Sequence, residues 1–220
     1  MNRLAFLLAG ALVASACAKA PEDHSPAAPQ VSEKADAGDR DQSLESLTRA
    51  FRNLGAVKTF RANMLSDRKQ EGIIESKVTA VLPDRFHLVN DSLEVKVIGS
   101  DLYRRFPDGS WKKASQSTDI TGLLDPKKLE AYISSAVEIK LVGEEELDGV
   151  PSEVYEASLP HIPATRGAHD RLQPFAAKVW VSKQDRLPRK LEGTALVSQV
   201  RTEVVYYDYN AKIKVQPPAN

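Results

Sequence analysis

The sequence predicts an α+β fold: a strongly curved antiparallel sheet of about ten or eleven strands, forming a half-barrel, with two or more helices in its concavity. Three observations indicate this fold. Residues 43–54 have the apolar spacing of an amphipathic helix, most later segments alternate with period two, and a second helical segment interrupts the strands near residue 126. This order favours one long antiparallel sheet, and a sheet of that length curls because its strands twist.

The two predicted helices each carry start signals. The first covers residues 43–54, begins at a suitable N-cap serine and is followed by Gly55, which commonly ends helices. The second covers residues 126–134, with Asp125 as its N-cap and proline at its first position. An amphipathic helix needs a surface to cover its apolar side. In the first helix that side consists of Leu44, Leu47, Phe51 and Leu54.

The remaining segments alternate between apolar and polar residues, which predicts strands. Turn signals separate several of them, notably Pro107-Asp108-Gly109 and Asp148-Gly149. A long loop is expected at residues 160–174, which contain three prolines. The predicted strands cover residues 60–64, 74–82, 86–88, 93–97, 102–106, 137–141, 154–159, 177–181, 186–193 and 196–207, with a last short strand at 213–215.

The N-terminus has the pattern of a lipoprotein signal peptide over residues 1–16. A positive residue precedes the apolar run 4–13, and small residues precede Cys17, the only cysteine of the chain. This run is shorter than the roughly 20 residues that a spanning helix needs. The segment resembles a bacterial lipobox, in which the cysteine becomes the lipidated first residue of the mature protein. The alternatives are ordinary secretion, with cleavage after Ala16 or Ala20, and a free buried thiol.

Residues 17–41 are predicted to join the lipidated Cys17 to the domain at 42–220 through a flexible linker. The linker has several prolines and alanines and no aromatic residue, so it cannot bury enough surface to order itself. A flexible chain of this length has a reach of about 25–30 Å. The second mature position is Ala18 rather than Asp, which resembles lipoproteins that Gram-negative bacteria export to the outer membrane. We therefore expect an outer membrane lipoprotein that faces the periplasm.

The charge balance argues against a nucleic-acid partner. The chain has 30 Lys and Arg against 30 Asp and Glu, so no global positive field draws it to nucleic acid or anionic lipid. Membrane association is then expected to depend on acyl chains such as palmitate on Cys17. The domain is long enough to bury its own core, and we expect a monomer without disulfide bonds.

Two C-terminal segments resemble hairpins of the LolA/LolB-like lipoprotein-carrier superfamily. Residues 146–155 (ELDGVPSEVY) resemble its D-G-hydrophobic-x-hydrophobic-Tyr hairpin, and residues 178–191 (KVWVSKQDRLPRKL) resemble its WVD…LP-x-K/R hairpin, with Ser182 in place of the Asp. Similar segments occur in LprG-type bacterial lipoproteins. The resemblance covers about residues 43–217, and it implies a half-barrel that shields acyl chains or lipidated partners in a cavity.

The chain offers candidate binding residues but no catalytic constellation. No G-x-S-x-G motif occurs, and His161 and His169 lack the compact spacing of metal ligands, so no enzyme, cofactor or metal is expected. Loop residues Arg166, His169 and Arg171 are candidates for contacting an anionic headgroup, or they belong to a solvated loop. Apolar residues on the predicted inward strand faces either line a hydrophobic cavity or form ordinary core: Phe60, Met64, Val78, Phe86, Leu88, Val95 and Trp180.

We therefore expect a lipid-anchored protein that binds or transfers a lipid, a lipoprotein or another hydrophobic ligand in a cavity between sheet and helices. The alternative is a non-catalytic structural or sensory module of the cell envelope that interacts with a protein.

Overall fold

A computed structural model describes residues 33–69, 72–114, 122–163 and 172–218. Two helices and eleven strands make up this part of the chain. In chain order they are α1 (Glu33–Ala56), β1 (Thr59–Arg68), β2 (Gly72–Val81), β3 (Arg85–Val89), β4 (Glu94–Ile98), β5 (Asp101–Arg105), β6 (Lys112–Ala114), α2 (Pro126–Ser134), β7 (Glu138–Leu147), β8 (Val150–Pro163), β9 (Leu172–Ser182), β10 (Pro188–Ala195) and β11 (Arg201–Tyr207).

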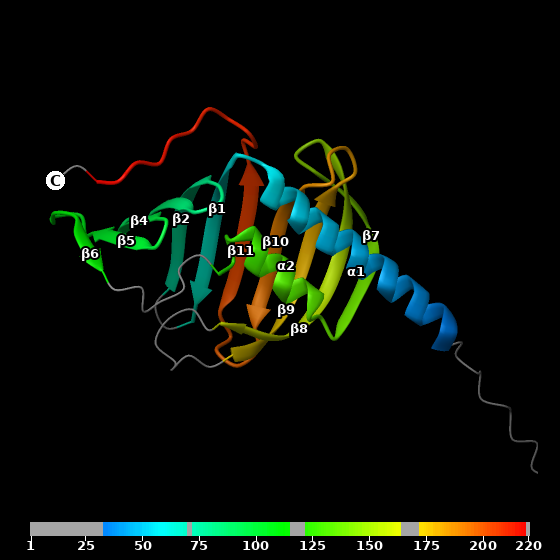
Figure 1. Ribbon diagram of the computed structural model, residues 1–220. Coiled ribbons are helices and arrows are strands. Elements are labelled where there is room, and N and C mark those ends of the chain that lie inside the picture. The colour runs from blue at the N-terminus through cyan, green and yellow to red at the C-terminus, as the bar shows by residue number, and fades with distance from the viewer. Residues whose placement is uncertain (1–32, 70–71, 115–121, 164–171, 219–220) are drawn as a thin grey trace, which may run out of the picture. The chain divides into compact units, whose positions relative to one another are not determined.

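All eleven strands form one antiparallel sheet with the order β6-β5-β4-β3-β2-β1-β11-β10-β9-β8-β7 (Figure 1). The sheet consists of two arms, the meanders β1–β6 and β7–β11. The pairing of β1 with β11, in which Ala62 lies opposite Tyr206, joins the two arms. The sheet is curved and does not close, because β6 and β7 remain at its two edges. The predicted α+β half-barrel is therefore confirmed.

Both helices lie against the same face of the sheet, which we call the inner face (Figure 1). The helices contact each other, and their contacts with strands concentrate on β7, β8 and β10. The stripe predicted for the first helix is buried at Leu47, Phe51 and Leu54, in one hydrophobic core with Leu129 and Ile133 of α2. Burial of these apolar side chains holds the helices on the sheet.

The helix cap predicted at Asp125 and the hairpin turn predicted at Asp148-Gly149 are both confirmed. Asp125 caps α2, and its side chain accepts a hydrogen bond from the backbone N–H of Lys127 at 3.0 Å. In the β7–β8 turn, Asp148 and Gly149 both have positive φ, 51° and 77°, as a two-residue hairpin of this type requires.

The first helix is longer than predicted. It begins at Glu33 instead of Ser43, so the predicted N-cap at Ser43 is wrong, and residues 33–41 of the predicted linker belong to the helix. Residues 38–42 are exposed, so the sequence has no apolar stripe there from which this part of the helix could be predicted.

Two further expectations need correction. Residues 213–215 do not form a strand, although Val215 is buried and its carbonyl accepts a hydrogen bond from Arg85 at 3.3 Å. The loop predicted at 160–174 is shorter, because β8 continues to Pro163 and β9 begins at Leu172. Prolines in these strands are compatible with pairing at a shift in register, which occurs between Leu159 and Ile162.

Candidate functional site

An apolar patch covers the inner face of β1–β4 and contains five of the predicted cavity residues. Antiparallel register brings them together: Val78 lies opposite Leu88, and Leu88 lies opposite Val95. The small residues Ala62 and Ala80 separate the larger side chains on β1 and β2. We define the apolar patch as Phe60, Val78, Phe86, Leu88 and Val95, all between 0 and 7 % exposed.

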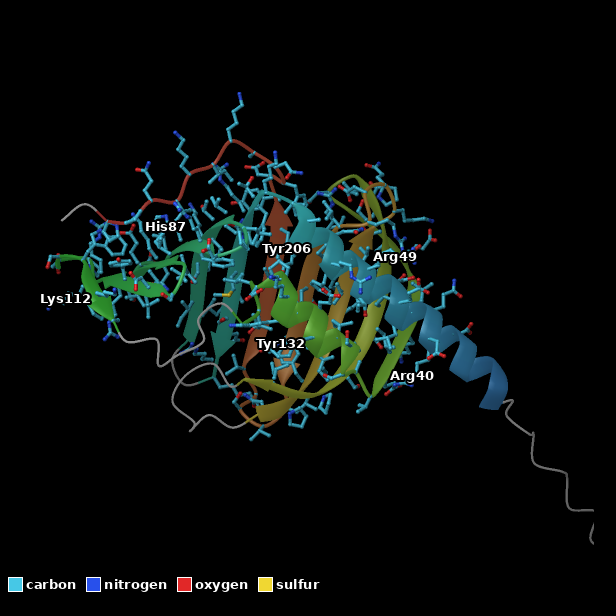
Figure 2. The ribbon with its side chains drawn as sticks, in the orientation of Figure 1. Arg40, Arg49, His87, Lys112, Tyr132 and Tyr206 are labelled. Carbon is cyan, nitrogen blue, oxygen red and sulfur yellow. The ribbon has the colours of Figure 1, made fainter. Side chains whose placement is uncertain are left out.

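The apolar patch belongs to the same hydrophobic core as the helices, yet it extends into the other arm of the sheet. Phe60 makes an edge-to-face contact with Tyr206, with ring centroids 5.7 Å apart. Tyr206 lies beneath the helices (Figure 2), and burial raises the pKa of its hydroxyl well above the usual range. From this contact the apolar surface continues through Val97 and Leu102 to β5. The sheet therefore carries a continuous inner apolar surface that is wider than the strands on which the helix contacts concentrate.

Met64 and Trp180, the other two predicted cavity residues, have different surroundings. Met64 is partly buried and packs against the core from β1. Trp180 lies on the outer face, away from the helices, so its prediction as an inward-facing residue is wrong. Its indole N–H donates to Glu145 at 2.7 Å, and the ammonium groups of Lys178 and Lys190 lie 4.7 and 5.1 Å from the ring centroid. The Trp180 ring is therefore buried by polar and charged side chains on the outer face, and not by the hydrophobic core.

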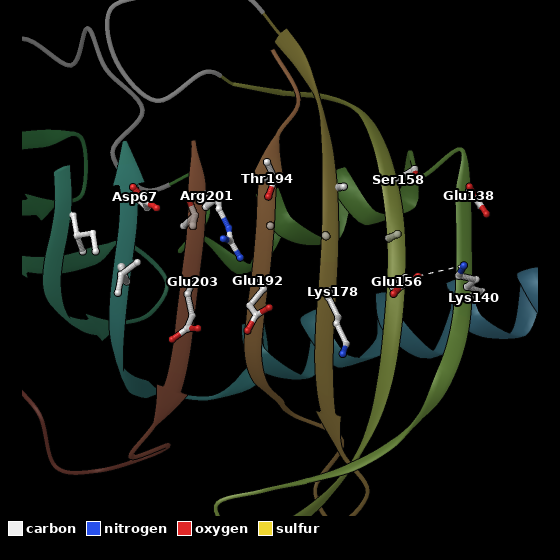
Figure 3. Close-up of a pocket in the computed structure, with 17 residues that line it drawn as sticks. Asp67, Glu138, Lys140, Glu156, Ser158, Lys178, Glu192, Thr194, Arg201 and Glu203 are labelled. Carbon is white, nitrogen blue, oxygen red and sulfur yellow. Dashed lines mark ion pairs between the residues drawn. The ribbon is translucent and has the colours of Figure 1, made fainter. Parts of the chain in front are cut away.

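The outer face of the sheet bears a groove of about 440 Å³ (Figure 3). Small residues such as Ala176 leave room for it, and charged side chains stand along it. Lys140 and Glu156, for example, form an ion pair of 3.2 Å. Such a polar lining does not match an acyl chain, which requires apolar walls. One cross-strand row of this lining consists of Lys140, Glu156, Lys178, Glu192 and Glu203.

A polar cluster at one end of the helix-covered arm contains a partly buried ion pair between Glu153 and Arg186. The carboxylate of Glu153 accepts hydrogen bonds from the Tyr155 hydroxyl at 2.6 Å and from Arg186 at 2.8 Å. Desolvation opposes ionisation of Glu153, but these hydrogen bonds and the charge of Arg186 outweigh it and lower its pKa. Asn53 of α1 donates to the Arg186 carbonyl at 3.3 Å, so the cluster also fixes this helix.

The other predicted site residues lie outside the described residues: Cys17 and the headgroup candidates Arg166, His169 and Arg171. Within the described part of the chain, no three His, Cys, Asp or Glu side chains come together as metal ligands would. Neither of the two described helices is long and apolar enough to cross a membrane.

No family model matches the sequence, and the comparison with curated proteins found no match. The fold, however, is similar to that of solved structures. The Mycobacterium tuberculosis lipoprotein LppX matches with a TM-score of 0.59 and 12 % identity, over 80 % of this chain and 99 % of LppX. LprF from Mycobacterium bovis matches with a TM-score of 0.61 and 10 % identity, over 82 % of this chain and 98 % of LprF. The chain thus shares its fold with these two solved structures, and this fold agrees with the α+β half-barrel predicted from the sequence.

Proposed function

We propose that the protein is a lipid-anchored component of the cell envelope, held in the outer membrane through Cys17, that binds a lipid, a lipoprotein or another hydrophobic ligand at the apolar patch. The half-barrel fold that it shares with LppX, a lipoprotein, supports this assignment. The signal-peptide pattern that ends at Cys17 independently supports the anchor.

The single observation that carries the ligand proposal is the width of the inner apolar surface. It spans β1 to β5, whereas the helix contacts with strands concentrate on β7, β8 and β10. An acyl chain needs only apolar contact, because each buried methylene contributes about 0.8 kcal/mol before the costs of binding. The apolar patch offers such contact without displacing the helices from their strands.

The second candidate function is an interaction module without a hydrophobic ligand. It is favoured by the burial of the apolar patch, where Phe60 is fully inaccessible to solvent and Val78 is 1 % exposed. A core that remains filled in solution leaves no space for an acyl chain, and the protein would then act through its surface rather than its interior.

Solvent extraction of the membrane-derived full chain, followed by mass spectrometry, separates the two candidates. The ligand proposal expects a lipid or acylated peptide in near-stoichiometric amount, and the interaction module expects none. Intact mass of the same preparation tests the anchor, because an acylated N-terminal Cys17 adds the mass of its acyl chains.

A matched pair of variants locates the ligand. Leu88→Ala alters the apolar patch, and Leu159→Ala alters the inner face of β8, in the arm that the helices contact. Both remove the same atoms from a buried leucine, so both destabilise the fold by about 2–5 kcal/mol. We expect the amount of lipid recovered per folded protein to fall several-fold for Leu88→Ala alone. Equal recovery from both variants would contradict a site at the apolar patch.

A further inference from the structure

Large apolar side chains are exposed at one end of the sheet. We call them the apolar rim: Ile73 (64 % exposed), Val137 (64 %), Leu196 (50 %) and Val197 (74 %). Ile73 lies at the start of β2, Val137 precedes β7, and Leu196 and Val197 lie between β10 and β11. In an antiparallel sheet these four positions share one end, the lower end of the strands in Figure 1.

The turn at the centre of the apolar rim has a fixed backbone. The N–H of Leu196 donates to the Pro174 carbonyl at 2.9 Å. The N–H of Ser198 donates to the side chain of Gln173 at 3.0 Å. These bonds tie the turn to β9, so the exposure of Val197 between them is a property of the folded turn and not of a frayed end.

The chain enters the domain at this same end. Near the start of α1, Arg40 donates to the Ala136 carbonyl at 3.1 Å, next to Val137 of the apolar rim. Near the other end of α1, Asn53 donates to the carbonyl of Arg186, in the turn between β9 and β10. The helix therefore runs away from the apolar rim, and its first residue, Glu33, lies on the side of the rim.

The length of this outer segment places the apolar rim near a membrane. About 15 residues separate Cys17 from the start of α1, and the flexible linker that the sequence predicts there would reach roughly 20 Å at that length. From the register, the apolar rim extends over six strand intervals, or roughly 29 Å along the sheet. Its members are thus separate points and not one contiguous patch, which suits insertion into a bilayer interface better than a protein interface of about 800 Å² per partner.

We propose that the apolar rim rests on the bilayer that holds the anchor, with Leu196 and Val197 inserted into its interface. This orientation rests on the proposed function for its anchor. It directs one end of the half-barrel to the lipid surface and keeps the opposite end, with the β9–β10 and β7–β8 turns, away from it.

The test uses the full chain, processed in a bacterial host and reconstituted into vesicles of phosphatidylethanolamine and phosphatidylglycerol that contain brominated phosphatidylcholine. Val197→Trp places a fluorophore in the apolar rim, and Gln184→Trp places one in the exposed turn at the opposite end. We expect quenching of Val197→Trp beyond that of the parent, and no such excess for Gln184→Trp.

Flotation and intact mass separate the two proposals. The rim proposal alone is overturned if the acylated protein co-floats with the vesicles but shows no excess quenching at position 197. It is overturned equally if the excess quenching occurs only at position 184. An unacylated chain whose co-flotation falls at least tenfold in Leu196→Ser/Val197→Ser refutes the anchor and supports the rim. A chain that does not float at all refutes both. Circular dichroism of each variant verifies folding.

Discussion

Replacing Gly193 with alanine perturbs the inner face at a point where the structure has no space. Gly193 lies on β10, opposite Ala177 of β9, and the ring of Phe175 covers it from a neighbouring position. A Cβ added to Gly193 would lie 2.1 Å from two carbon atoms of that ring and 3.1 Å from the Ala176 carbonyl oxygen. Because Phe175 is buried, the ring cannot move into solvent.

The magnitude follows from the contact distance. Carbon atoms in contact are normally about 3.5–4.0 Å apart, so the ring must shift by roughly 1.5 Å. Overpacking of this kind costs about 1–3 kcal/mol. The substitution offsets part of this overpacking cost, because glycine in a strand is less favourable than alanine by roughly 0.5–1 kcal/mol. We expect a net loss of about 1–2 kcal/mol in the free energy of unfolding, which lowers Tm by roughly 2–8 °C for a domain of this size.

Urea and thermal unfolding followed by circular dichroism measure this loss. Phe175→Leu in the Gly193→Ala background should restore part of the stability, and a double-mutant cycle should give a coupling of about 1 kcal/mol or more. The control is Gly38→Ala on exposed α1, where an added Cβ meets nothing within 4 Å and stability should stay or rise. An unchanged Tm for Gly193→Ala, or additivity with Phe175→Leu, would refute the packing described for this arm.

Three further outcomes are expected. Asp125→Ala removes the cap of α2 and should lower the free energy of unfolding by about 1 kcal/mol, measured by urea unfolding with Asp125→Asn as a nearly neutral control. Trp180→Phe removes the indole hydrogen bond to Glu145 and should cost about 1–2 kcal/mol without changing bound lipid in the extraction assay, because the ring is on the outer face. Glu153→Gln weakens the pairing with Arg186. Because the pKa of Glu153 in the folded protein lies below its ordinary 4.5, the stabilisation from its charge is present above pH 4.5 and disappears as the pH falls through the folded pKa. The difference in unfolding free energy between variant and parent, measured by urea unfolding, should therefore be constant at pH 6–8 and close in acid.

Most of the sheet could be predicted because its residues obey local rules. Alternation from Ile74 to Leu82 matches β2 at Gly72–Val81, and the Asp148-Gly149 dipeptide fixes the β7–β8 hairpin. The early start of α1 could not be predicted, since exposed residues show no periodic apolar signal. Tertiary contact of Arg40 with the Ala136 carbonyl, 96 positions away, contributes to ordering that part of the helix, and no local pattern contains it.

The face assigned to Trp180 failed for a different physical reason. The segment Val179-Trp180-Val181 is buried throughout, and the large apolar side chain of Trp180 suggests the inner face, although strict alternation places it on the same face as the polar Lys178. The partner that settles the matter, Glu145, belongs to β7, where the register shifts between Leu141 and Gly143. A bulge inverts the inside–outside pattern of the residues beyond it, and it can be located only from the pairing of two strands.

The two arms of the sheet are not equivalent as places for a ligand. In the helix-covered arm, even the space beside Gly193 is occupied by Phe175, and Asn53 hydrogen-bonds α1 to the β9–β10 turn. A second contact, the ion pair of Arg52 with Glu130, joins α1 to α2. Entry of an acyl chain in this arm would break these contacts together. Entry at the apolar patch breaks none of them, so ligand binding is expected to leave the helices in place, and hydrogen exchange of α1 and α2 should be unchanged when lipid is removed.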